Sequence, residues 1–101
     1  VSLEIERLSS DKKSIHQLEN FVNRYKGNIM TTIRTHLPNL NEMDYRLLCY
    51  LCAGFSAKAI SIFTGDSTNN IYVKKSRIKD IIVELKDENV KREILEAITV
   101  R

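Results

Sequence analysis

The sequence contains little of what tight turns and extended strands require. Of its 101 residues only three are glycine and one is proline, and tryptophan is absent. A fold built from strands needs many turns, and turns draw heavily on glycine and proline. Alternation of apolar and polar residues, which marks half-buried strands, is also missing. These absences exclude an all-β fold, and we expect an all-α fold.

Long apolar runs are absent as well. No stretch of 18 apolar residues occurs, so we expect this part of the protein not to be inserted in a membrane. Glu4, Glu6 and Arg7 interrupt the apolar residues near the N-terminus, which argues against a secretory signal peptide. The chain starts with Val1 rather than methionine. We therefore expect it to be a piece of a longer protein.

Residues that could carry catalysis or bind metal are few. The only cysteines are Cys49 and Cys52, and the only histidines are His16 and His36. A structural zinc site needs four ligands, and these four residues lack the spacing of any such site. We expect both cysteines to be small core residues, with no metal or other cofactor. Free thiols suit a reducing cytoplasm, and no serine lies in a nucleophile motif, so an enzyme is not expected.

The positive charge is concentrated in one region. The whole chain has a net charge of +3, whereas residues 56–79 alone carry +4, because Asp66 is the single acid among five bases. The bases are Lys58, Lys74, Lys75, Arg77 and Lys79. Such a local excess is typical of a nucleic-acid-binding face, although a solvated, lysine-rich helix face has the same composition.

The first third of the chain has helical periodicity. From Ile15 to Leu37 most apolar residues recur at steps of three and four. One long helix fits this pattern, as does a short helix followed by a second over residues 11–36, and Pro38 ends either. We expect residues 1–38 to be the end of a linker or coiled coil that packs on a domain formed by residues 39–101. The apolar side chains around Phe21 belong either to the hydrophobic core or to the interface of a dimer.

Capping residues divide the rest of the chain into four further helices. Asn41, with Asp44 three positions later, predicts a helix start, and Gly54 predicts its end. Ser56 caps a short helix over residues 57–64, which Gly65 closes. The last two helices follow a cap at 67 or 68 and a break at 87–89. Small residues stand where the first two of these helices cross, namely Cys52, Ala53, Gly54, Ala57, Ala59 and Ser61.

Apolar spacing predicts which side chains these helices bury. In the helix that follows residue 67 the inward-facing residues are expected to be Ile71, Ile78, Ile81 and Ile82. We expect one shared core to contain Ile29, Ile33, Leu48, Leu51, Ile60, Ile71 and Ile78.

Helix, glycine, short helix, glycine-containing turn and helix is the order of a helix-turn-helix. At these residues the chain resembles the LuxR/NarL type of DNA-binding domain. The resemblance covers residues 40–85 and is carried by Leu40-Asn41, Gly54-Phe55-Ser56-Ala57-Lys58-Ala59-Ile60-Ser61, Thr64-Gly65-Asp66-Ser67, Asn70-Ile71-Tyr72 and Ser76-Arg77-Ile78. The Leu-Pro-Asn-Leu-Asn and Ser-Arg-Ile-Lys runs are similar to the C-terminal domains of Bacteroidetes tetratricopeptide-repeat transcriptional regulators.

The resemblance implies binding of double-stranded DNA for transcription regulation in the bacterial cytoplasm. The recognition helix would span about Ser67 to Leu85, and upstream sensor or repeat domains would belong to the same chain. A homodimer is left open. The implied DNA-binding residues are Ser56, Lys58, Thr68, Asn69, Tyr72, Val73, Lys75, Ser76, Arg77 and Lys79, with Lys74 a further candidate for phosphate contact.

Five positions depart from the family pattern, among them Ser61 and Thr64, and the other three support a different function. Glutamate is usual where Ala59 stands, lysine or arginine at Tyr72, and a polar residue at Val73. The alternative is therefore a protein-interaction or dimerisation module, on a helix-turn-helix scaffold that has lost contact with DNA.

Overall fold

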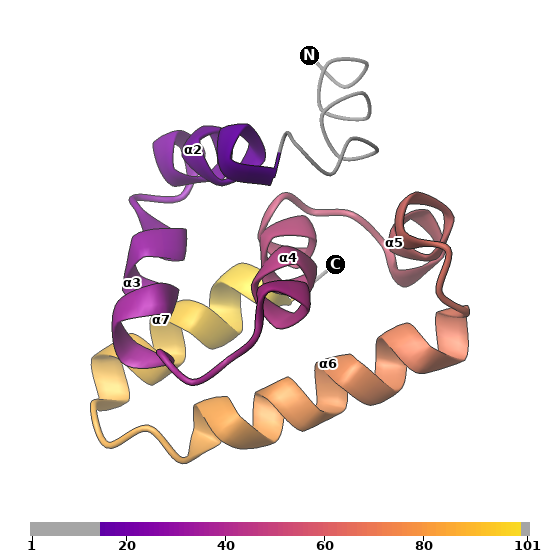
Figure 1. Cartoon of the computed structure of the whole chain (residues 1–101). Coiled ribbons are helices and arrows are strands. Elements are labelled where there is room, and N and C mark those ends of the chain that lie inside the picture. Colours follow the sequence, from indigo (N-terminus) through magenta and orange to yellow (C-terminus); the bar gives the residue numbers. More distant parts are fainter. Residues whose placement is uncertain (1–14, 100–101) are drawn as a thin grey trace.

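A computed structural model of the chain describes residues 15–99 and is all-helical over that range (Figure 1). The described helices are α2 (Ile15–Tyr25), α3 (Ile29–His36), α4 (Glu42–Cys52), α5 (Ala57–Thr64), α6 (Thr68–Val83) and α7 (Glu88–Ile98). The expected all-α fold is confirmed. No helix in this part of the chain combines the length and the apolar composition needed to cross a bilayer.

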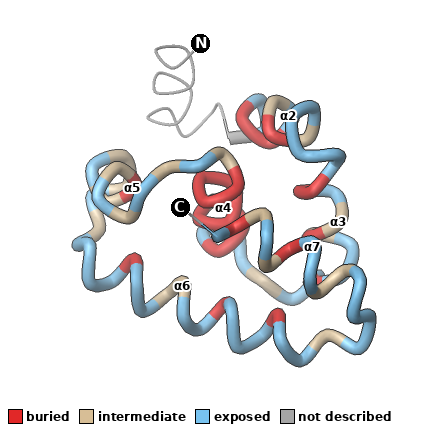
Figure 2. Tube along the Cα trace, turned by 180° about the vertical axis from the view of Figure 1, so that it is seen from behind, coloured by how far each residue is buried: buried red, intermediate tan, exposed pale blue. Residues whose placement is uncertain are grey.

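Helix α4 is the central element of the fold. Eight of its eleven residues are buried, and α2, α3, α6 and α7 all pack against it (Figures 1 and 2). Its first turn is fixed by a capping box, in which the Asn41 side chain accepts from the Asp44 amide at 2.8 Å and Asp44 accepts from the Asn41 amide at 3.4 Å. The cap predicted from the sequence is confirmed.

The buried apolar side chains form one core that extends from Leu18 in α2 to Ile98 in α7. All seven residues expected to share it are buried: Ile29, Ile33, Leu48, Leu51, Ile60, Ile71 and Ile78. Ile81 was expected to face inward, but 37% of it is exposed. The expectation is wrong because the buried row of α6 runs through Ile71, Ile78 and Ile82, and Ile81 lies on the flank of that row.

Two helices stand where the sequence predicted one continuous helix over residues 11–36. The break lies at Gly27 and Asn28, which adopt left-handed conformations with φ of 62° and 61°. Glycine adopts this conformation without cost, and asparagine is among the few other residues that tolerate it. The Asn23 side chain then accepts a hydrogen bond from the Met30 amide at 2.8 Å in the first turn of α3. The expectation of an unbroken helix is therefore wrong for residues 15–36, and residues 11–14 of that prediction lie outside the described part of the chain.

Side-chain caps begin the remaining helices; the caps at Ser56 and Ser67 were predicted from the sequence, whereas residues 87–89 were predicted only as a break. Ser56, Ser67 and Asp87 accept hydrogen bonds from backbone amides at the starts of α5, α6 and α7. Gly65 ends α5 in a left-handed conformation with φ of 79°. The Phe63 ring of α5 lies 5.9 Å from the Tyr50 ring of α4, centroid to centroid, and attaches α5 to the centre of the molecule.

Candidate functional site

Helix α6 lies along the outside of the molecule and presents most of its surface to solvent (Figure 2). Only Ile71, Ile78 and Ile82 are fully buried on it, and they hold the helix against the core. At 16 residues α6 is the longest helix of the described part of the chain. The exposed face of α6 is therefore a long helical surface available for binding.

The connection between α5 and α6 fixes where α6 begins. The Ser61 hydroxyl donates to the Asp66 carbonyl at 2.5 Å, and the Asp66 amide donates to the Thr64 hydroxyl at 3.2 Å. The Ser67 hydroxyl accepts from the Asn70 amide at 3.1 Å and so caps the first turn. These bonds satisfy polar groups of the turn and limit its freedom.

One flank of α6 carries two basic residues whose charges are already paired. Lys74 Nζ lies 2.6 Å from Asp66 Oδ2, and an Arg77 guanidinium nitrogen lies 2.5 Å from Asp44 Oδ1. The hydrogen bond from Lys74 lowers the pKa of the Asp66 carboxyl group. Only 5% of the Asp44 side chain is exposed, whereas half of the Arg77 side chain is. This flank, Lys74 and Arg77 with their acidic partners, is called the paired flank below.

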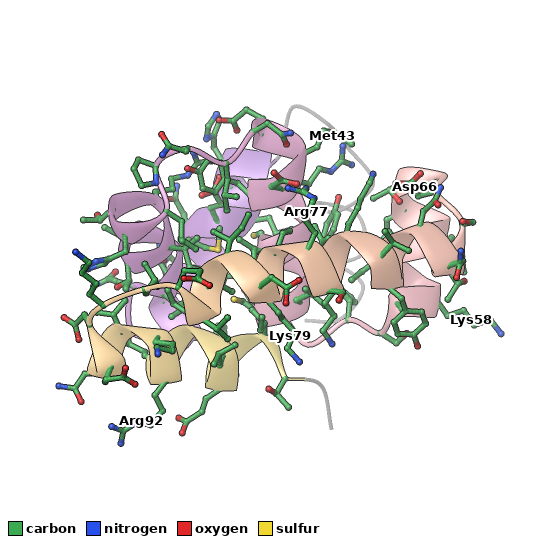
Figure 3. All side chains as sticks on the ribbon, turned by 90° about the horizontal axis from the view of Figure 1, so that it is seen from below. Met43, Lys58, Asp66, Arg77, Lys79 and Arg92 are labelled. Carbon is green, nitrogen blue, oxygen red and sulfur yellow. The ribbon has the colours of Figure 1, made fainter. Side chains whose placement is uncertain are left out.

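The other flank of α6 carries basic residues without such partners. Lys75 and Lys79 are four positions apart and line a shallow hollow with Tyr72, Ser76 and Asp80. Residues at this spacing share one face of a helix. Neither lysine forms an ion pair within the part of the chain that the structure describes. Lys79 and Arg77 extend to opposite sides of α6 (Figure 3). The face formed by Tyr72, Lys75, Ser76 and Lys79 is called the open flank below.

Most of the residues that the sequence predicted as a site therefore lie together on α6. Thr68, Asn69, Ser76 and Lys79 are exposed, and Lys75 is half-buried. Exposed fractions of 58% at Tyr72 and 59% at Val73 are large for apolar side chains.

The two predicted residues outside α6 lie on or next to α5. Ser56 and Lys58 are both exposed, and the Ser56 hydroxyl accepts from the Ala59 amide at 3.2 Å. Lys58 extends from the far side of α5, well apart from Lys79 (Figure 3).

The acidic partners on the paired flank were not predicted from the sequence. Asp44 was predicted only as part of a helix cap. Its carboxylate also accepts a hydrogen bond from Arg77, which lies 33 residues further along the chain. Asp66 lies eight residues before Lys74, across the α5–α6 turn. Neither pair has the three- or four-residue spacing that identifies ion pairs within a helix, so no local signal was present.

A second charged cluster joins the N-terminal helices to α4. Arg34 of α3 donates twice to the Glu19 carboxylate of α2, each time at 2.8 Å, and also contacts Glu42 at 3.3 Å. The Arg34 guanidinium lies 4.2 Å from the centroid of the Tyr45 ring. Arg34 lowers the pKa of the Glu42 carboxyl group. The cluster fastens α2, α3 and α4 together.

The cysteines are packed in the core. Cys49 and Cys52 are buried, unoxidised residues of α4. Burial raises the pKa of Cys52 to about 12 and shifts the pKa of Cys49 in the same direction. Their expected place in the core is confirmed. Within residues 15–99 no group of three or more His, Cys, Asp or Glu side chains is arranged to hold a metal ion.

Comparisons of the chain with models of protein families, with curated proteins and with solved structures found no match.

Proposed function

We propose that this chain is the DNA-binding domain of a bacterial transcription regulator. In this proposal α4, α5 and α6 form a helix-turn-helix of LuxR/NarL type, and α6 enters the major groove of duplex DNA. The observation that carries the proposal is the open flank, where two lysines with no ion-pair partner among residues 15–99 lie beside polar and aromatic side chains on the outer helix. The proposal implies a cytoplasmic location and upstream sensor or repeat domains in the same chain.

The basic residues of the open flank suit phosphate contact. Lys75 and Lys79 place two ammonium groups along one edge of α6. A helix that enters the major groove has phosphate strands on both sides, and flanking cations fix its register there. At the start of α5, next to the Ser56 cap, the amides of the first turn and the Lys58 ammonium group can bind a further phosphate.

The exposed side chains between Thr68 and Ser76 of α6 suit contact with base edges. Thr68, Asn69 and Ser76 can exchange hydrogen bonds with bases, while Tyr72 and Val73 offer apolar contact. In the major groove each base pair presents a distinct pattern of donors, acceptors and the thymine methyl group. In this proposal these five side chains provide the preference between DNA sequences.

Charge reversal on the open flank tests the proposal. A variant with Lys75→Glu and Lys79→Glu should lose binding to a fluorescent duplex at low salt, measured by anisotropy. The matched control is Arg24→Glu with Arg92→Glu, which makes the same change in net charge at exposed residues of α2 and α7. Because phosphate attraction depends on where the cations lie, the control should keep nearly all of its affinity.

Two results would reject the DNA proposal. One is unchanged affinity in the Lys75→Glu, Lys79→Glu variant at low salt. The other is an equal loss of affinity in the control, which would mean that only overall charge matters. The duplexes should be drawn from a randomised pool, because a preferred site can then be selected in the same experiment.

A second candidate function is a protein-interaction or dimerisation module on the same scaffold. Exposed apolar side chains favour it, since 73% of Ile62 in α5 is exposed in addition to Tyr72 and Val73 in α6. Large exposed apolar patches mark interaction surfaces. Sedimentation at increasing concentration separates the two functions: association that Ile62→Ser and Val73→Ser abolish, without any DNA binding, supports the module.

A further inference from the structure

We infer that Arg77 and Lys74 are positioning residues that set the orientation of α6, and that phosphate contact is left to the open flank. The DNA readout of this inference rests on the proposed function, whereas its stability readout does not. It departs from the sequence-based expectation that both residues bind phosphate.

The two ion pairs fasten α6 at separate points to separate parts of the molecule. Lys74 reaches Asp66 in the α5–α6 turn, and Arg77 reaches Asp44 in the first turn of α4. Lys74 and Arg77 are three positions apart and share one face, so both contacts oppose rotation of α6 about its own axis. Because Lys75 and Lys79 lie on the opposite side, this orientation keeps the open flank directed to solvent (Figure 3).

The Asp44 carboxylate makes two contacts at once, so loss of its ion pair with Arg77 should destabilise the fold. One carboxylate oxygen accepts a hydrogen bond from the Asn41 amide in the α4 capping box, and the other accepts one from the Arg77 guanidinium. The side chain is buried, so without Arg77 the carboxyl group would be shielded from water and would lack its ion-pair partner. Removing the partner of a buried charged group destabilises a protein more than removing an exposed charge that has no partner.

Charge neutralisation also indicates that Lys74 and Arg77 position α6, whereas the open flank contacts phosphate. A cation that is already paired has little counterion release to gain from a phosphate, because its charge is compensated before DNA arrives. Lys74 and Arg77 are compensated in this way at 2.6 Å and 2.5 Å. Lys75 and Lys79 have no ion-pair partner among residues 15–99.

The experiment compares thermal stability with the salt dependence of DNA binding in the full chain. Arg77→Met should lower Tm by more than about 5 °C, since 1 kcal/mol is worth roughly 4–8 °C in a chain of this size. Its affinity for duplex DNA, measured well below Tm, should fall by the same factor at every salt concentration. Lys79→Met, the control, should leave Tm nearly unchanged and flatten the log–log salt slope by about one unit.

A double-mutant cycle connects the effect to Asp44. If Arg77 acts through Asp44, then Arg77→Met should have little further effect on Tm or on DNA affinity once Asp44→Asn is present. Flattening of the salt slope by about one unit in Arg77→Met would overturn the inference whatever happens to Tm, because that is the result expected of a phosphate contact. Additive effects of the two substitutions on Tm would overturn it as well.

Two other results of these experiments also bear on the inference. If Arg77→Met does not fold, Lys74→Met serves in its place, because the Lys74–Asp66 pair is partly exposed and its loss should be milder. An unchanged salt slope with reduced affinity then supports the inference, and a flattened slope overturns it. If the wild-type chain binds no DNA at all, the proposed function fails, and the Tm cycle alone decides whether Arg77 positions α6 through Asp44.

Discussion

At the scale of single residues, burial rather than residue type determines what a side chain can do. Cys49 and Cys52 have the spacing of redox and metal motifs, yet both side chains lie in the protein core, on the buried surface of α4. The thiolate is the reactive form of cysteine, and burial disfavours it, as the pKa of about 12 at Cys52 indicates. The spacing therefore reflects packing on the buried surface of a helix.

We predict that both thiols resist alkylation by iodoacetamide at pH 8 while the chain is folded, and react fully in urea. The folded chain should react only as fast as it opens, and mass spectrometry measures the incorporated label. Reductant and chelator should leave the helical circular-dichroism signal and Tm unchanged. Rapid labelling of either cysteine in buffer would contradict its buried position.

Asp66 makes a pH-dependent contribution to stability. Its folded-state pKa is lowered by Lys74, so the contribution is fully present above the ordinary carboxyl pKa and disappears as pH falls through the folded-state pKa. We predict that Lys74→Met raises the Asp66 titration midpoint in carboxyl-detected NMR. The difference in Tm between the wild type and Lys74→Met should shrink at acidic pH, and a constant difference would contradict the pairing.

At the scale of elements, the start of α6 depends on the conformation of one glycine. Gly65 adopts φ of 79°, and nothing lies within 4 Å of where its Cβ would be, so a side chain would meet strain in the backbone rather than a clash. The left-handed backbone conformation costs an L-residue roughly 1–2 kcal/mol, and it costs asparagine less. The predicted cost of Gly65→Ala is therefore about 1 kcal/mol, and that of Gly65→Asn should be smaller.

Urea denaturation measures both glycine variants. If α6 is the binding element, Gly65→Ala should also weaken DNA affinity, because the turn fixes where that helix begins. Equal stability of the alanine and asparagine variants would contradict the left-handed conformation.

Helices and caps were largely predictable from the sequence because their signals are local. Asn41, Ser56, Ser67 and Gly65 each act within a few residues, and all were predicted to end or begin a helix. The break at Gly27 and Asn28 escaped prediction, because the apolar rhythm continues across it from Val22 to Ile29 and hides the change in backbone direction.

The candidate site was predictable only in part. Its exposed residues on α6 follow from helical periodicity. The pairing of Arg77 with Asp44 depends on how two distant helices pack, and no sequence pattern of one chain reports that.

At the scale of the whole molecule, one core supports every described helix. Leu51 lies in the central helix and is buried, so Leu51→Ala should remove 2 to 5 kcal/mol, roughly, from the free energy of unfolding. Ile62→Ala is the matched control, and because the Ile62 side chain is mostly exposed its cost should lie within about 0.5 kcal/mol of zero. Urea denaturation gives both values, and similar costs for the two variants would contradict a core centred on α4.

The central position of α4 also has a consequence for motion. Helices α2, α3, α6 and α7 cannot detach without exposing α4, so its amide hydrogens should exchange with solvent deuterium only when the whole fold opens. Helix α5 makes its contacts mainly with α6 and reaches the core through Ile60 and Phe63, so we expect α5 and the start of α6 to open together more readily than the helices packed directly on α4, exposing α4 mainly around Tyr50. The segments proposed to meet DNA are then the least protected against exchange, and they can adjust to a binding partner without loosening the rest of the protein.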